Sequence, residues 1–131
     1  MTHDPRTVSA ESTLTDAAVL MRDDDVGAIV VEREGAIAGV VTDRDIVVRA
    51  IAQGHDPATT QVGDVASESV VTVTPDQSVE DVRRLMREHD VRRIVVEQGG
   101  RAAGIVSLGD LAVDGDADAE LTDISAASPN R

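Results

Sequence analysis

Two stretches of the chain carry the residue types best suited to hold a ligand. Each contains a glycine, a hydroxyl residue three positions later and an aspartate three positions after that: Gly39, Thr42 and Asp45, and again Gly104, Ser107 and Asp110. An apolar stretch typical of a strand leads into each hydroxyl residue. A hydroxyl, a carboxylate and the N–H groups of a new helix would therefore meet where a strand ends. Such a corner can hold a sugar through its carboxylate and an anion through its backbone.

The same spacing also fits a purely structural role. A hydroxyl residue followed three positions later by an acid forms a capping box, which satisfies the free N–H groups of a helix start without a ligand. Both interpretations remain open for Thr42 with Asp45 and for Ser107 with Asp110. They are partly compatible, because a hydroxyl can cap a helix and still contact a ligand.

The two stretches belong to an internal repeat. Shifting the sequence by 65 positions aligns residues 7–47 with residues 72–112 without a gap. Runs of identity include Leu20-Met21-Arg22 with Leu85-Met86-Arg87, and residues 29–32 with residues 94–97. A duplicated unit predicts two copies of one fold, packed about a pseudo-twofold axis.

Each copy reads as strand–helix–strand–strand–helix, which predicts an α/β (α+β) fold. Thr13 and Ser78 are expected N-caps of helices that end near residues 24–25 and 89–90. Strands are predicted at residues 7–8, 28–31, 37–41, 70–73, 94–96 and 102–106, with hairpin turns at residues 33–35 and 98–100. After the first corner, the pattern predicts a second helix whose apolar face holds Ile46, Val47, Ala50 and Ile51.

The repeat sets the expected domain boundaries. Residues 1–54 form the first repeat and residues 70–113 the second. Residues 55–69 are predicted to be a linker with a short helical turn at residues 62–65. The acidic tail at residues 114–131 is predicted to be disordered.

Composition narrows the class of protein. The 131 residues are 41% hydrophobic without any Phe, Trp or Tyr, so the core must be built from small aliphatic side chains. The formal net charge is −13, and all 12 basic residues are arginine. Such a surface excludes nucleic-acid binding and favours either a salt-loving cytoplasm or an acidic partner-binding surface.

The lack of cysteine excludes disulfides and thiolate metal sites. The sequence shows neither a signal peptide nor an apolar run long enough to cross a membrane, so a cytoplasmic location is expected.

The repeated unit resembles the CBS domain, and the tandem pair resembles a CBS pair, or Bateman module. The resemblance rests on the two Gly-x-x-Thr/Ser-x-x-Asp motifs, the lead-in at residues 62–65 and the apolar run before each hairpin. It implies an adenosine-containing ligand, such as AMP, ADP, ATP, NAD or S-adenosylmethionine, bound between the repeats. Asp45 and Asp110 would accept ribose hydroxyls, and Thr42 and Ser107 would donate to a sugar or phosphate oxygen.

The resemblance also assigns the remaining site residues. The base would lie near aliphatic side chains: Val8, Val26 and Ala28 in one site, and Val73, Val91 and Arg92 in the other. Gly39 and Gly104 would leave room for the ligand beside the strand. Arg93 would bind phosphate at the second corner, whereas the equivalent residue of the first repeat, Ala28, has no charge to do so. Since Asp43 adds a negative charge to the first corner, the second corner is expected to bind phosphates better.

These features predict a regulatory, non-enzymatic module that needs no cofactor. It would sense an adenine nucleotide or related ligand, signal through changed packing in a homodimer, and act on an unidentified partner protein. The alternative is a structural dimerisation module whose ligand sites are vestigial. An enzymatic reading ranks third, because no nucleophile, base or metal cluster is visible in the sequence.

Overall fold

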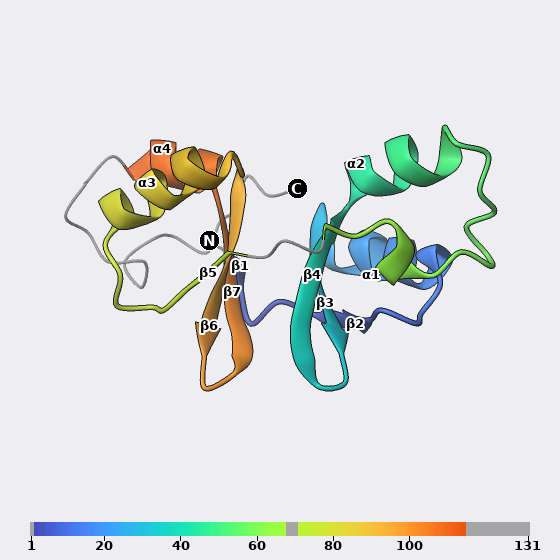
Figure 1. Cartoon of the computed structure of the whole chain (residues 1–131), viewed down its shortest axis with the longest axis horizontal. Helices are drawn as coiled ribbons and strands as arrows, with labels where there is room; N and C mark the ends of the chain where they lie inside the picture. The colour runs from blue at the N-terminus through green and yellow to red at the C-terminus, as the bar shows by residue number, and fades with distance from the viewer. Residues whose placement is uncertain (1, 68–70, 115–131) are drawn as a thin grey trace. The chain divides into compact units, whose positions relative to one another are not determined.

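The computed structural model describes residues 2–67 and 71–114. These residues fall into two compact units, one built from residues 6–67 and the other from residues 2–5 with residues 71–114 (Figure 1). Most of the predicted acidic tail, residues 115–131, lies outside the described residues, as do residues 68–70 of the predicted linker and second repeat.

The first unit is a three-stranded sheet with helices on one face (Figure 1). Its strands are β2 (Thr7–Ser9), β3 (Ala28–Arg33) and β4 (Ala36–Thr42), in the order β2-β3-β4. The helix α1 (Leu14–Asp24) connects β2 to β3, which run parallel, and β3 and β4 form an antiparallel hairpin. After β4 come the short α2 (Asp43–Asp45), the π-helix η1 (Ile46–Ile51) and the 3₁₀ turn η2 (Val62–Asp64).

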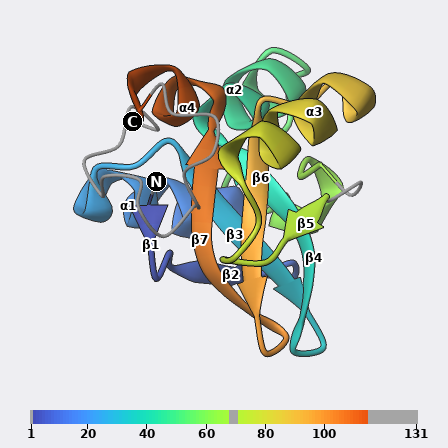
Figure 2. The same ribbon diagram turned by 90° about the vertical axis from the view of Figure 1, so that its left-hand side faces the viewer.

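The second unit repeats this plan with one additional strand. It contains β5 (Thr72–Val73), α3 (Val79–His89), β6 (Arg93–Gln98), β7 (Arg101–Ser107) and α4 (Leu108–Asp114). The additional strand is β1 (Thr2–His3), and the sheet order is β1-β7-β6-β5. Figure 2 shows α3 and α4 lying over β6 and β7. The predicted order of strand–helix–strand–strand–helix is confirmed in both repeats.

The duplication extends to the details of the backbone. In β3–β4 the register pairs Ala28 with Thr42, and in β6–β7 it pairs the equivalent Arg93 with Ser107. Both hairpins carry a bulge at the same place, after Val31 and after Val96. Both turn through two residues with positive φ, Glu34-Gly35 and Gly99-Gly100, as a tight hairpin of right-handed strands requires.

Helix ends match the capping signals in the sequence. The Thr13 hydroxyl accepts the N–H of Asp16 at 3.2 Å, and the Asp16 carboxylate accepts the N–H of Thr13 at 3.3 Å, which completes a capping box. The Ser78 hydroxyl caps α3 in the same way, by accepting the N–H of Asp81. At the other ends, Asp25 and Asp90 adopt the left-handed conformation that stops the helix.

Removing the Thr13 cap should destabilise the first unit. We expect Thr13→Ala to lower the free energy of unfolding by about 1 kcal/mol, because the start of α1 loses a bonded hydroxyl. Urea unfolding followed by circular dichroism measures the change. The matched control is Thr15→Ala, since Thr15 is an exposed α1 residue outside the capping box. Equal effects of the two substitutions would contradict the capping role.

The first core includes residues expected in the linker. Val62, Val65 and Ala66 are buried with Leu14 and other small aliphatic side chains. Backbone bonds hold this segment in place: the Val62 N–H donates to the Ser12 carbonyl at 2.7 Å. The expected helical turn at residues 62–65 is confirmed as η2, but the segment is a structural part of the first unit and not only a connection.

The expected apolar face of the helix after the first corner is only partly correct. Ala50 is buried and Ile46 packs against the core, but Val47 and Ile51 are 58% and 51% exposed. The reason is that the helix widens into a π-turn, in which the N–H of Ala52 reaches the carbonyl of Val47, five residues back. This wider turn alters the spacing at which residues share a face.

Short lead-in segments complete both sheets in equivalent ways. Ser67 pairs with Val40 beside β4, and Thr2 pairs with Ile105 of β7. A shift of 65 positions relates these two pairs. Residues 2–5, predicted to lie in the first repeat, therefore belong to the second unit, whose sheet Thr2 and His3 join.

Candidate functional site

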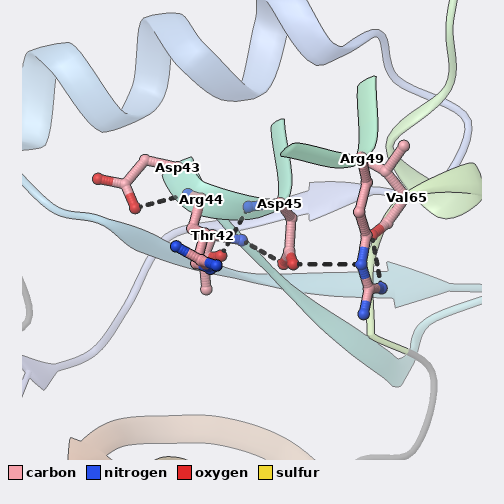
Figure 3. Close-up of polar contacts among 6 residues, drawn as sticks. All are labelled: Thr42, Asp43, Arg44, Asp45, Arg49 and Val65. Carbon is pink, nitrogen blue, oxygen red and sulfur yellow. Dashed lines mark hydrogen bonds and ion pairs between the residues drawn. The ribbon is translucent and has the colours of Figure 1, made fainter. Parts of the chain in front are cut away.

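The first corner is a closed pair of hydrogen bonds at the end of β4 (Figure 3). The N–H of Thr42 donates to Oδ2 of Asp45 at 2.9 Å, and the N–H of Asp45 donates to Oγ1 of Thr42 at 3.1 Å. Thr42 is thus the N-cap of α2, and Asp45 completes the capping box. The helix cap that the spacing of these residues predicts is confirmed.

Capping leaves part of each side chain available for a ligand. The Thr42 hydroxyl accepts one hydrogen bond and still has its own hydrogen to donate. The Asp45 carboxylate accepts the Thr42 N–H through Oδ2, whereas a carboxylate offers about four acceptor positions. The Asp45 side chain is 17% exposed, so solvent or a ligand reaches it. The corner can therefore cap its helix and accept a sugar hydroxyl at once.

Arg49, which is not among the predicted site residues, also contacts this corner. Its Nε lies 3.8 Å from Oδ1 of Asp45, and its Nη1 donates to the carbonyl of Val65 at 3.3 Å (Figure 3). The i,i+4 spacing of Asp45 and Arg49 was a readable signal for the ion pair. Nothing in the sequence pointed to the Val65 carbonyl.

The second corner has the same geometry but is more deeply buried. The N–H of Ser107 donates to Oδ2 of Asp110 at 2.8 Å, and the N–H of Asp110 donates to Oγ of Ser107 at 3.1 Å. Asp110 is only 2% exposed. Arg93 lies opposite Ser107 across the β6–β7 ladder, so the structure brings the expected phosphate-binding residue to this corner.

The loops before β3 and β6 are bonded to the corners. The N–H of Asp43 donates to the carbonyl of Gly27 at 3.0 Å, and the N–H of Leu108 donates to the carbonyl of Arg92 at 2.8 Å. These bonds place the loop residues predicted to line the base beside the carboxylate motifs. The residues so placed are Val26 and Ala28 at the first corner, and Val91 and Arg92 at the second.

Other predicted site residues lie in the structural framework. Val8 and Val73 are buried in the hydrophobic cores of their own units. The room expected beside Gly39 for a ligand is taken by the chain itself, because a Cβ there would collide with the carbonyl oxygen of Ser67. At Gly104 the register partner is His3 of β1. Gly39 therefore serves the close approach of two backbones.

A cavity of about 360 Å³ in the first unit is separate from the corner motif. It is lined by Val31, Arg33, Ala38, Gly63 and Ala66, none of which belongs to the motif. Within residues 2–67 and 71–114, histidines and acidic residues form no cluster of three that could hold a metal ion. No helix in these same ranges has the length and hydrophobicity needed to cross a lipid bilayer.

Comparison with known proteins assigns both repeats to one family. The family model described as the CBS domain matches the chain twice, at residues 1–51 and 62–113. The chain belongs to the CBS domain family. CBS domains are generally regulatory, ligand-binding modules, and both corner motifs lie inside the matched ranges.

Relatives from several organisms share the tandem arrangement of CBS repeats. The CBS domain-containing protein YhcV of Bacillus subtilis is 44% identical over 114 residues, which span 87% of this chain and 81% of YhcV. Hypoxic response protein 1 of Mycobacterium tuberculosis is 39% identical over 106 residues, or 80% of this chain and 74% of that protein. The hexameric CBS-CP12 protein from bloom-forming cyanobacteria superposes with a TM-score of 0.79 at 35% identity, covering 88% of this chain and 68% of that one.

Proposed function

We propose that this CBS pair is a regulatory module that binds an adenosine-containing ligand, such as AMP, ADP, ATP, NAD or S-adenosylmethionine, at its two corner motifs. The observation that carries the proposal is the first corner, where Thr42 and Asp45 cap α2 while the Thr42 hydroxyl keeps a hydrogen to donate and solvent reaches the Asp45 carboxylate; Ser107 and Asp110 repeat the same bonds at the second corner.

The chemistry of each corner suits a ribose. In this proposal, the partly exposed Asp45 carboxylate takes the ribose hydroxyls at the first corner and Asp110 is its counterpart at the second, since hydrogen bonds to a charged carboxylate are roughly twice as strong as neutral ones. Thr42 and Ser107 donate their hydroxyl hydrogens to a sugar or phosphate oxygen. Arg93 beside Ser107 supplies positive charge for phosphate at the second corner.

Signalling would follow from linkage between ligand binding and conformation. A ligand present at 100 times its dissociation constant stabilises the conformation it prefers by about 2.7 kcal/mol. That amount is enough to shift a two-state packing or dimer equilibrium and thereby alter contact with a regulated protein. The proposal includes no catalysed reaction and no required cofactor, and it places the protein in a cytoplasm of high salt, where its net charge of −13 would be screened.

Thermal unfolding in concentrated KCl tests the proposal. We expect the midpoint to rise by several degrees with at least one of AMP, ATP, NAD and S-adenosylmethionine at saturation, because 1 kcal/mol shifts the midpoint of a small domain by about 4 to 8 °C. Inorganic phosphate at the same concentration is the control for a general ionic effect. A midpoint unchanged by every ligand would leave the dimerisation module as the better account.

One observation favours the second candidate function, self-association. Val47, Val48 and Ile51 of the η1 segment are 58%, 43% and 51% exposed, and these neighbouring residues form an apolar strip on one short helix. Contiguous apolar surface on a protein this charged marks a site of contact. The oligomeric state of the CBS-CP12 relative supports a second copy of this chain as the occupant.

A charge placed in the strip should separate the copies. We expect Val47→Asp to raise the dissociation constant of the homodimer by at least about tenfold, since burying an unpaired carboxylate at an interface is costly. Light scattering coupled to size exclusion measures the mass. Val19→Asp is the matched control, because Val19 is 38% exposed on α1 and lies outside the strip. Loss of the dimer in both variants, or in neither, would argue against this interface.

A further inference from the structure

The first corner contains a cation that none of the predicted site residues supplies. Arg49 extends from η1. This helix is fixed to the first core by the buried Ala50 and the partly buried Ile46. The Arg49 backbone is therefore held by the core, whereas its side chain is 57% exposed. A long cationic side chain on a fixed backbone can exchange partners without disturbing the fold.

The Arg49 guanidinium contacts two acceptors of different kinds. One is Oδ1 of Asp45, the carboxylate oxygen that the Thr42 N–H does not occupy. The other is the main-chain carbonyl of Val65, in the lead-in segment that connects the first unit to the second (Figure 3). Arg49 thus links the proposed ribose acceptor to the lead-in segment, residues 62–67.

We infer that Arg49 determines the phosphate specificity of the first corner and transfers the presence of a phosphate to the lead-in segment. This inference rests on the proposed function. A ribose hydroxyl bonded to Oδ1 of Asp45 brings the attached phosphate close to the guanidinium. A phosphate is a stronger partner for a guanidinium than a neutral carbonyl, because both ions are charged and the bond can be bidentate. Arg49 therefore leaves the Val65 carbonyl when the ligand carries a phosphate and keeps it when the ligand does not.

The charges around the corner support this role. Asp43 and Asp45 both belong to α2, so an anionic ligand needs nearby cations to approach. The Asp43 carboxylate is already engaged with the N–H of Arg44 at 2.8 Å, and Arg49 is the cation paired with Asp45. The residue 65 positions after Arg49 is Asp114, so the second corner has no arginine at the equivalent position. The first corner was expected from sequence to be the weaker phosphate site. In this inference Arg49 gives it a phosphate-binding cation of its own.

Release of the Val65 carbonyl has a defined structural consequence. The lead-in segment is held by the backbone bonds of Val62 to Ser12, of Gly63 to Ala10 and of Ser67 to Val40, with Arg49 attached between the last two. Loss of the middle attachment loosens the segment while its two ends stay bonded. A phosphorylated ligand would then change the mobility of residues 62–67, and an unphosphorylated one would not.

Calorimetric titration with adenosine and with AMP tests the specificity, using the full chain at one fixed salt concentration. In Arg49→Gln, AMP affinity at the first corner should fall about tenfold, because one charge-assisted contact is lost, and adenosine affinity should change less than about twofold. Arg49→Lys keeps the charge without the planar fork and should give an intermediate AMP affinity. Arg22→Gln makes the same charge change at an exposed surface pair and should leave both affinities unchanged.

Hydrogen exchange on the same proteins tests whether phosphate binding changes the mobility of the lead-in segment. A change in residues 62–67 also assigns the binding to the first corner. AMP, but not adenosine, should speed exchange in residues 62–67 of the wild type, and Arg49→Gln should show fast exchange there without ligand. Equal losses of AMP and adenosine affinity, or an unchanged preference for AMP, would overturn the role of Arg49 and leave the proposed function intact. Failure of the wild type to bind either ligand would overturn both.

Discussion

Replacing Gly39 with alanine should lower the free energy of unfolding of the first unit by about 3 kcal/mol, the upper part of the range for overpacking a closed site. A Cβ at this position would meet the carbonyl oxygen of Ser67, and this oxygen accepts the N–H of Val40 at 3.3 Å. Both colliding groups are held by backbone pairing, so neither can rotate away. The lead-in segment would have to separate from β4.

The same substitution at Gly63 provides a matched comparison. There a Cβ would lie 2.8 Å from the guanidinium of Arg33, which is the end of a flexible side chain, and 3.1 Å from Ala10. We expect Gly63→Ala to cost only about 1 kcal/mol, because Arg33 can move. Urea unfolding of both variants measures the difference. A smaller loss for Gly39→Ala than for Gly63→Ala would contradict the close approach of Ser67 to β4.

Removing the charge of the corner carboxylates should have the largest effect on ligand affinity. Asp45→Asn keeps an oxygen that can accept the Thr42 N–H, but its amide group cannot accept ribose hydroxyls as the carboxylate can. We expect the affinity of the first corner for an adenosine ligand to fall by about 10- to 100-fold, as the loss of a charge-assisted hydrogen bond predicts. Asp110→Asn should do the same at the second corner.

Asp43→Asn is the matched control for this experiment. It removes one negative charge from the same short helix, but the Asp43 carboxylate accepts the N–H of the neighbouring Arg44 and is no part of the capping box. Calorimetric titration should show that Asp43→Asn binds at least as tightly as the wild type. A loss in Asp43→Asn equal to that in Asp45→Asn would mean that net charge, and not the ribose contact, controls binding.

Local patterns in the sequence predicted most of the fold. The ungapped repeat anticipated two copies of one unit, and the structure repeats even the bulge after Val31 and after Val96. The N-caps at Thr13 and Ser78 were predictable because an N-cap bond joins residues only three positions apart. The corner bonds of Thr42 with Asp45, and of Ser107 with Asp110, were predictable for the same reason.

Contacts between distant backbone segments were not predictable from these patterns. The approach of Ser67 to Gly39 and the pairing of β1 with β7 join residues far apart in the chain through main-chain atoms, which have no signature in residue type. The π-turn at η1 moved Val47 and Ile51 to the surface, because periodicity assumes a regular α-helix. The bond from Arg49 to the Val65 carbonyl was not predictable either, because its acceptor is a main-chain atom 16 residues away.

A crystal structure of the protein soaked with AMP tests the central claim most directly. The account predicts a ribose whose hydroxyls lie within hydrogen-bonding distance of the carboxylate of Asp45 or Asp110, with Thr42 or Ser107 against a sugar or phosphate oxygen. AMP bound elsewhere on the chain, with neither carboxylate in contact with the ribose, would show that the corners are structural and that the sensor account is wrong.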